Sequence, residues 1–204
     1  MKKLKKIGIE LSEIKYLLLT HYHDDHAGFG AQLIKETEAR LIAHKNAVPL
    51  LEKGISINPF VDKKGRNLNF CVKMLNYFHS MFISRTFTYP PIKIKNTDIV
   101  IESDDDEVLK EIDIEGKILH TPGHTSDSIS VLLSDGSAIV GDAAVNFLNI
   151  CHIKYRPIYA ENYEDVFKSW DKLIRYGAKI IYPAHGNPFN VEKLELQLEK
   201  ITKK

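Results

Sequence analysis

A run of six residues at positions 21–26, His-Tyr-His-Asp-Asp-His, constrains this 204-residue chain more than any other feature. It follows a short apolar run that is typical of a buried strand. Side chains two apart on an extended segment point to the same side, so His21 and His23 can bind one ion. Asp25 and His26, just past the strand, can turn toward a second ion. Imidazole and carboxylate ligands suit zinc and also accept iron or manganese. The alternative is a solvated loop that is rich in His and Asp by chance.

Three further segments each place a possible ligand after a short apolar run. They are Thr-Pro-Gly-His-Thr at 121–125, Val-Gly-Asp at 140–142 and Pro-Ala-His-Gly at 183–186. Ligands that follow strands and lie beside Gly or Pro suit a site built on loops held by a rigid sheet. Each segment alone is a weak signal, and the four-part combination is a strong one.

In this order the residues resemble the metallo-β-lactamase-fold hydrolases, whose mark is His-x-His-x-Asp-His followed by a distant His, a bridging Asp and a final His. The similarity runs from about Ile14 to Gly186 and fills all seven ligand positions. It implies an α/β fold of the αββα sandwich type. It also implies that His21, His23 and His124 hold one metal ion, that Asp25, His26 and His185 hold the other, and that Asp142 bridges the two.

The resemblance implies a mechanism as well. Two Zn²⁺ ions, or Fe or Mn in their place, roughly 3.5–4 Å apart, would lower the pKa of a bridging water toward about 7 and generate a hydroxide nucleophile. Asp25 and Asp142 are the expected catalytic residues, and Tyr155 or Tyr159 could donate a hydrogen bond to the oxyanion. Two divalent cations, two carboxylates and one hydroxide would leave the centre slightly positive, which favours a small anionic substrate. Asp24 and Thr125 are expected to orient ligands.

The expected reaction is hydrolysis of a small ester, thioester or lactone, and the tight His124 segment with its Gly-Asp bridge resembles the glyoxalase-II-like branch. Only 18 residues, 187–204, follow Gly186, so the substrate-binding extension of true glyoxalase II is expected to be missing. β-Lactam hydrolysis is less favoured, because classical zinc β-lactamases usually lack the bridging Asp that Asp142 supplies. Two alternatives stay open: a catalytically impaired binding or scaffold protein of the same fold, and a persulfide dioxygenase with one iron.

We expect a single metallo-β-lactamase-like domain over 1–204, with an aromatic lid-like insertion at about 54–91. Only twenty residues precede His21, so the first strands usual in this fold are expected to be lacking. An unpaired sheet edge and an exposed apolar face invite pairing with a second chain, so a homodimer is possible. The insertion is equally compatible with a lid over the metals and with an added helix pair or an oligomer contact. Its aromatic and charged residues include Phe70, Tyr77, Phe78, His79, Phe82, Arg85, Phe87 and Tyr89.

Composition excludes several classes of function. A net charge of +1 argues against a broad nucleic-acid surface. No apolar run approaches membrane-spanning length, and no signal-peptide core follows the basic start, so a cytoplasmic location is expected. Cys71 and Cys151 are too few for a disulfide framework and are expected to be reduced thiols. Of the other histidines, His44 and His120 are expected to be structural, and His152 beside Cys151 is a weak thiol–imidazole candidate.

Periodicity predicts alternating strands and helices after the first cluster. Strands are expected at 16–20, 40–43, 92–101, 115–120, 129–133 and 138–140, with a hairpin turn at 134–137. Helices are expected at 2–14, 30–37, from 44 toward 53, at 163–176 and at 191–201. The acidic run 104–107 is expected to be a solvated turn.

Overall fold

The computed structural model describes residue 4 and residues 6–57, 86–147 and 154–202. The chain divides into two compact units. The first contains Met1–Ile57 and Thr86–Glu102, and the second contains Ser103–Lys204. None of the helices described has the length and hydrophobicity needed to cross a lipid bilayer.

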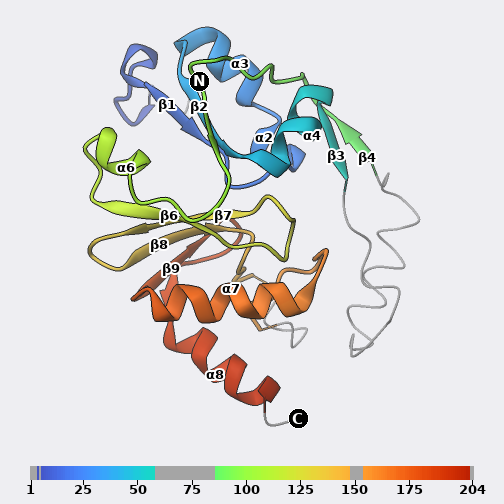
Figure 1. The fold of residues 1–204 in the computed structure, drawn as a ribbon, viewed down its shortest axis with the longest axis vertical. Helices are drawn as coiled ribbons and strands as arrows, with labels where there is room; N and C mark the ends of the chain where they lie inside the picture. The colour runs from blue at the N-terminus through green and yellow to red at the C-terminus, as the bar shows by residue number, and fades with distance from the viewer. Residues whose placement is uncertain (1–3, 5, 58–85, 148–153, 203–204) are drawn as a thin grey trace. The chain divides into compact units, whose positions relative to one another are not determined.

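The first unit is built on a three-stranded parallel sheet with the order β1-β2-β5. Its strands are β1 (Tyr16–Leu18), β2 (Arg40–His44) and β5 (Ile99–Ile101), and a separate antiparallel pair joins β3 (Ile55–Ile57) to β4 (Thr86–Thr88) (Figure 1). Its helices are η1 (Leu11–Glu13), α2 (Asp24–Ala27), α3 (Gly30–Thr37), η2 (Lys45–Ala47) and α4 (Val48–Lys53). Ahead of β1, the described residues contain η1 and no strand.

The 21–26 segment directly follows β1 and is anchored by its own apolar residues. Tyr22 and Ala27 are buried in one core cluster with Leu19, Leu41 and Leu51. Tyr22 therefore anchors the segment in the core of this unit, and the segment turns into α2 immediately after His23.

The second unit is built on a five-stranded sheet with the order β10-β9-β8-β7-β6. Its strands are β6 (Gly116–His120), β7 (Ile129–Leu133), β8 (Ser137–Gly141), β9 (Ile180–Pro183) and β10 (Phe189–Asn190). Its helices are α6 (Val108–Glu111), α7 (Tyr163–Arg175) and α8 (Glu192–Thr202). The β8–β9 pair is parallel, and the other neighbouring pairs are antiparallel.

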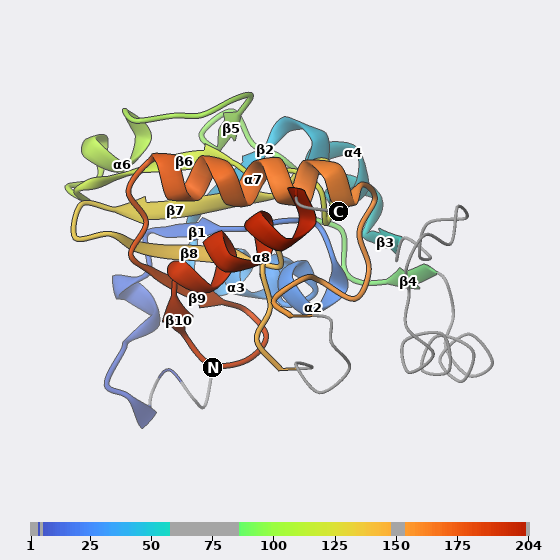
Figure 2. The same cartoon turned by 90° about the horizontal axis from the view of Figure 1, so that it is seen from below.

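Helix α7 lies along one face of this sheet, with α8 beside it (Figures 1 and 2). Its buried stripe consists of Val166, Ser169, Trp170 and Leu173, spaced as one face of a helix requires. Asn162 begins the helix by accepting a hydrogen bond from the backbone N–H of Glu164. The apolar members of the stripe share a core cluster with residues of β6, β7, β8 and β9.

Most of the predicted elements are confirmed, including α3 and β7 with the predicted bounds. The predicted strand at 92–101 is wrong for its first part, because only Ile99–Ile101 pairs. The backbone N–H of Lys95 instead donates to the side chain of Asp98, and that of Asp98 donates to the carbonyl of Lys95, which forms a turn before β5. The acidic run is not simply solvated, because Asp104 accepts hydrogen bonds from Lys172 and from the backbone of His120.

The pairing of β3 with β4 was not predicted from the sequence. It joins residues near the two ends of the predicted insertion at about 54–91, of which residues 58–85 lie outside the described part of the chain. The single-domain organisation also stays a prediction, since the two units are described separately.

Candidate metal centre

In the second unit, strand direction brings three predicted ligands to one edge of the sheet. β8 and β9 are parallel, and β6 runs the same way as β8 because both are antiparallel to β7. The loops after these three strands carry His124, Asp142 and His185. Asp142 follows β8, which lies between β6 and β9 in the sheet order, so the carboxylate stands between the two imidazoles.

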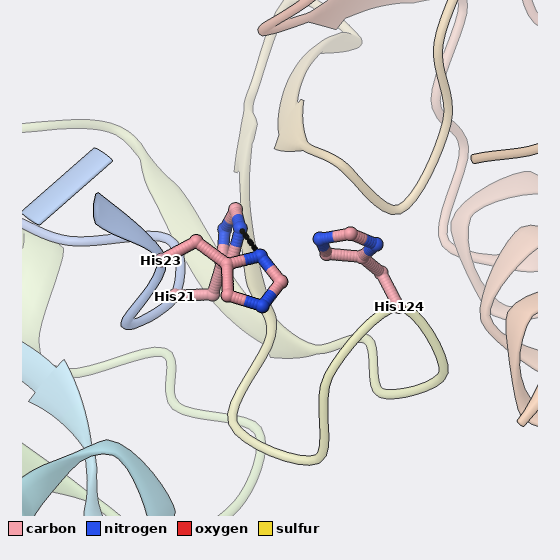
Figure 3. A group of neighbouring side chains, drawn as sticks. All are labelled: His21, His23 and His124. Atoms are coloured by element: carbon pink, nitrogen blue, oxygen red, sulfur yellow. Dashed lines mark hydrogen bonds between the residues drawn. The ribbon is translucent and has the colours of Figure 1, made fainter. Parts of the chain in front are cut away.

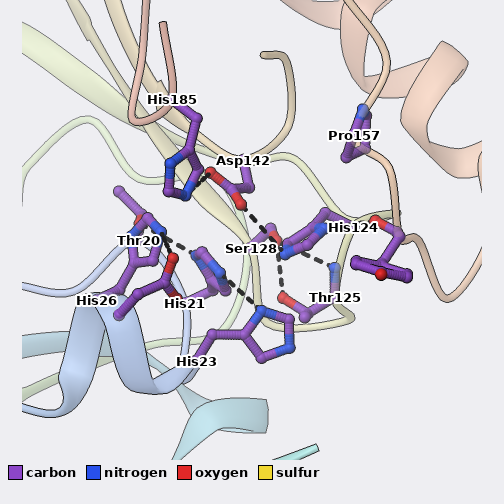
Figure 4. Close-up of polar contacts among 12 residues, drawn as sticks. Thr20, His21, His23, His26, His124, Thr125, Ser128, Asp142, Pro157 and His185 are labelled. Atoms are coloured by element: carbon purple, nitrogen blue, oxygen red, sulfur yellow. Dashed lines mark hydrogen bonds and ion pairs between the residues drawn. The ribbon is translucent and has the colours of Figure 1, made fainter. Parts of the chain in front are cut away.

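Each oxygen of Asp142 faces a different histidine (Figure 4). Oδ2 lies 3.6 Å from Nε2 of His124, and Oδ1 lies 3.6 Å from Nε2 of His185. Asp142 is only 9% exposed. These separations exceed normal hydrogen-bond lengths. They are close to the roughly 3.3 Å between two ligand atoms that each lie about 2.0 Å from one tetrahedral zinc ion.

Backbone carbonyls hold these ligands in place. Nδ1 of His124 lies 2.7 Å from the carbonyl oxygen of Tyr159, which can only accept, so the proton is on Nδ1 and Nε2 keeps its lone pair. The backbone N–H of Asn146 donates to the carbonyl of His185 at 2.8 Å. That bond ties the His185 loop to the segment that follows Asp142.

In the first unit, His21 and His23 direct their ring nitrogens toward one point. Nε2 of His21 lies 3.1 Å from Nδ1 of His23 (Figure 3). Both rings are buried. Nε2 of His23 lies 3.1 Å from the carbonyl oxygen of Ile57, which assigns the proton to Nε2 and leaves Nδ1 as the ligand atom.

Asp25 and His26, the other two predicted ligands of the segment, also lie close together. Nε2 of His26 lies 3.7 Å from Oδ2 of Asp25. Nδ1 of His26 lies 3.2 Å from Oγ1 of Thr20, and the same hydroxyl lies 3.3 Å from Nδ1 of His21 (Figure 4). One hydroxyl oxygen can accept from both Nδ1–H groups, which leaves both Nε2 atoms available to a metal ion.

The residues present therefore fit a metal centre. All seven predicted ligands belong to groups of His and Asp side chains that could hold an ion. Within each unit, the close pairs of ligand atoms are 3.1–3.7 Å apart, as ligands of one ion would be. In His23 and His124, one ring nitrogen donates to a backbone carbonyl, and the other nitrogen is left unprotonated as the ligand atom. This is the usual support for a metal-binding imidazole.

Sequence reasoning missed the supports of this site. Thr20 stands directly before the motif, so its hydroxyl was visible as a candidate. The carbonyls of Ile57 and Tyr159 carry no side-chain signal, because any residue type supplies one. Thr125 binds Ser128 rather than a ligand side chain, with 2.8 Å between the two hydroxyl oxygens. Asp24 begins α2, and its role in orienting a ligand stays a prediction.

Tyr155 and Tyr159, the two candidate donors to the oxyanion, differ in their surroundings. The ring of Tyr155 packs on Phe189 with 4.4 Å between centroids, which is a structural role. Tyr159 is half-buried, and burial raises the pKa of its phenol. Burial likewise raises the pKa of Glu161, against hydrogen bonds from Ser126 that lower it.

The other histidines in the described residues are structural, as predicted. His44 is buried at the end of β2, where Nδ1 accepts from the backbone of Asn46 and Nε2 lies 3.2 Å from the carbonyl oxygen of Glu102. His120 directs Nε2 to the carbonyl of Ser126 at 2.9 Å. His79, His152, Cys71 and Cys151 lie outside the described residues.

Comparison with known proteins places this arrangement in a family. A family model described as the metallo-beta-lactamase superfamily matches residues 1–185. A metallo-beta-lactamase fold-containing protein of Sulfurisphaera tokodaii is 24% identical over 197 residues, which cover 95% of this chain and 69% of that protein. A UPF0173 metal-dependent hydrolase of Staphylococcus aureus is 26% identical over 187 residues, which cover 90% of this chain and 72% of that protein.

Solved structures show the same fold. The crystal structure of a metallo-beta-lactamase family protein of Thermus thermophilus matches with a TM-score of 0.64 and 21% sequence identity, and the match covers 99% of this chain and 65% of that one. The predicted fold class, an αββα sandwich of the metallo-β-lactamase type, is confirmed by this match and by the mixed sheets and helices of the two units. The chain belongs to the metallo-beta-lactamase superfamily, and this membership, with its His- and Asp-rich ligand groups, supports metal-dependent hydrolysis as the general class of its activity.

Proposed function

We propose that this protein is a dinuclear metal-dependent hydrolase that cleaves a small, anionic ester, thioester or lactone. In this proposal the seven ligands act together in the order of the family pattern. One ion is held by His21, His23 and His124, the other is held by Asp25, His26 and His185, and Asp142 bridges the two.

The arrangement around Asp142 is the observation that carries the proposal. Each of its two oxygens faces the Nε2 atom of a different histidine at 3.6 Å. A carboxylate that served one ion would not need an imidazole opposite each oxygen. Zinc is the expected metal, because imidazole nitrogen and carboxylate oxygen are both common zinc ligands, and the same set also accepts iron or manganese.

The chemistry of hydrolysis then divides between the ions and the chain. Bound there, a pair of divalent ions supplies Lewis acidity that lowers the pKa of water and polarises the scissile carbonyl. Asp25, whose side chain is 51% exposed, is placed to pass a proton to solvent or to the leaving group at its carboxylate oxygens. Tyr159, whose phenol pKa is raised further above its ordinary value of 10.0 by burial, would donate its O–H to a developing oxyanion.

A relative and the ligand segments support hydrolysis. A relative that is 26% identical to this chain over 187 residues is described as a metal-dependent hydrolase. The glyoxalase-II-like reading, and with it a thioester substrate, follows from the same ligand segments. A small substrate agrees with a net charge of +1, since the chain has no overall excess of positive charge to attract a polyanion.

A substrate panel tests this proposal. Purified protein reconstituted with zinc is assayed against thioesters, lactones, simple esters, phosphodiesters and β-lactams. We expect hydrolysis of one acyl class that chelation removes and zinc restores. Asp142→Ala should abolish it, whereas Asp171→Asn, which changes an exposed carboxylate that pairs with Arg175 on α7, should leave it unchanged. Zinc-loaded protein that is inert across the panel would contradict a hydrolase and support a binding protein.

A further inference from the structure

Helix α7 contacts the loops that carry two of the proposed ligands. The Ser169 hydroxyl donates to the carbonyl oxygen of Pro122 at 2.7 Å, two residues before His124. The indole N–H of Trp170 donates to the carbonyl oxygen of Ala143 at 2.7 Å, next to Asp142. Ser169 and Trp170 are consecutive on the helix and are both buried.

The start of α7 adds contacts to the first of these loops. The backbone N–H groups of Glu161 and Asn162 donate to the carbonyls of His124 and Gly123, each at 3.0 Å. Gly123 has φ +135°, and a β-carbon there would collide with the backbone nitrogen of Val166 in the first turn of the helix. Only glycine permits this approach, so the loop backbone rests directly on α7.

The strands alone do not fix the distance between His124 and Asp142. His124 lies four residues beyond the end of β6, and β6 is separated from β8 by β7 in the sheet. A loop of that length has many conformations, and ordering it costs conformational entropy. Attachment of both loops to adjacent residues of one rigid helix removes that freedom.

We propose that Ser169 and Trp170 are positioning residues for the metal centre, which set the 3.6 Å separation between Nε2 of His124 and Oδ2 of Asp142. Neither side chain touches a ligand atom; each acts through the carbonyl it binds. This inference rests on the proposed function, because it assigns the purpose of the spacing to metal binding. It places the determinants of metal affinity on a helix that contains none of the proposed ligands.

Metal binding by Ser169→Ala and Trp170→Phe tests the inference. Each variant removes one hydrogen-bond donor. Leu173→Val is the matched control, because it trims the same buried stripe at a side chain that donates no hydrogen bond. Zinc dissociation constants are measured by competition with a chromophoric chelator. The visible absorption of the Co²⁺-substituted protein reports ligand geometry independently of activity.

We expect each donor variant to bind zinc about tenfold or more weakly and to shift the Co²⁺ bands, since supports behind metal ligands typically contribute 10–100-fold to affinity. Leu173→Val should lower the melting temperature with an unchanged spectrum. If the unmodified protein binds two ions and both donor variants match it in affinity and spectrum, the positioning role is wrong and the proposed function stands. If the unmodified protein binds no metal, both proposals fail. Should Trp170→Phe not fold, Ser169→Ala decides the matter alone.

Discussion

The hydroxyl oxygen of Thr20 lies 3.2 Å from Nδ1 of His26, six residues further along the chain. The same oxygen lies 3.3 Å from Nδ1 of His21. In the proposed centre these two histidines bind different ions. Under the proposal, this one small side chain after β1 would orient an imidazole ligand of each ion.

Thr20→Val should weaken metal binding while leaving the fold intact. Valine has the shape of threonine and lacks the oxygen, so both rings lose a partner at Nδ1. Loss of such a partner typically lowers affinity by 10–100-fold, and we expect a value near the lower end, because the side-chain volume is kept. Zinc competition with a chelator measures it.

Thr20→Ser is the control for that change, because it keeps the hydroxyl and loses only a methyl group. It should bind zinc within about twofold of the unmodified protein. Equal affinity of the valine and serine variants would show that the hydroxyl has no part in metal binding.

Removal of the metal should destabilise the protein. A ligand that binds only the folded state adds about 4 kcal/mol when its free concentration is about 1,000 times its Kd. Calorimetry should therefore show a lower melting temperature after chelation and recovery when zinc is added back. Asp142→Asn should respond far less to zinc. A melting temperature that does not change on chelation of zinc-loaded protein would contradict metal binding that stabilises the folded state.

Tyr22→Phe should lower the free energy of unfolding by about 1 kcal/mol, the usual net value of one hydrogen bond. Tyr22 is buried, and its phenol O–H donates to the carbonyl of Ile57, the same oxygen that Nε2 of His23 binds. His23 keeps its own bond in the variant, so zinc affinity should fall much less than in Thr20→Val. Urea denaturation of the metal-free protein separates this loss of stability from any effect on metal.

The stability of the hairpin between β7 and β8 should decrease at acidic pH. The backbone N–H of Ser137 donates to the carboxylate of Asp135, which lowers the pKa of that exposed group below its ordinary 3.8. A folded-state pKa below the unfolded value means that the stabilisation is present above about pH 4 and is lost as the pH falls through the folded-state pKa. NMR titration of the Asp135 carboxyl should give a midpoint below that of an exposed aspartate in the same spectrum. A midpoint at or above the ordinary value would contradict the hydrogen bond.

The proposed ligands were predicted because four segments, each a weak signal alone, together resemble the pattern of a known family, and each segment follows a short apolar run. His21 and His23 follow an apolar strand with alternate spacing, and Asp142 follows Gly141 at the end of β8. Helix α7 was predicted for a similar reason, since its apolar residues recur with helical spacing and Gly177 follows it. These are properties of neighbouring residues, which a single sequence contains.

The supports could not be predicted, because they depend on contacts between distant segments. Ile57 lies 34 residues from His23, and Ser169 lies 47 residues from Pro122. The acceptors in both contacts are backbone carbonyls, which every residue type supplies. The strand expected over 92–101 failed because Asp98 binds the backbone of Lys95, a side-chain contact that alternation of apolar residues does not reveal.

Metal stoichiometry tests the central proposal most directly. The full chain is reconstituted with zinc, freed of weakly bound ions and measured by elemental analysis beside Asp142→Asn. We expect about two ions per unmodified chain and about one or fewer in the variant, because in the proposal Asp142 is a ligand of both ions. No tightly bound metal in the unmodified chain, or two ions retained by Asp142→Asn, would contradict it.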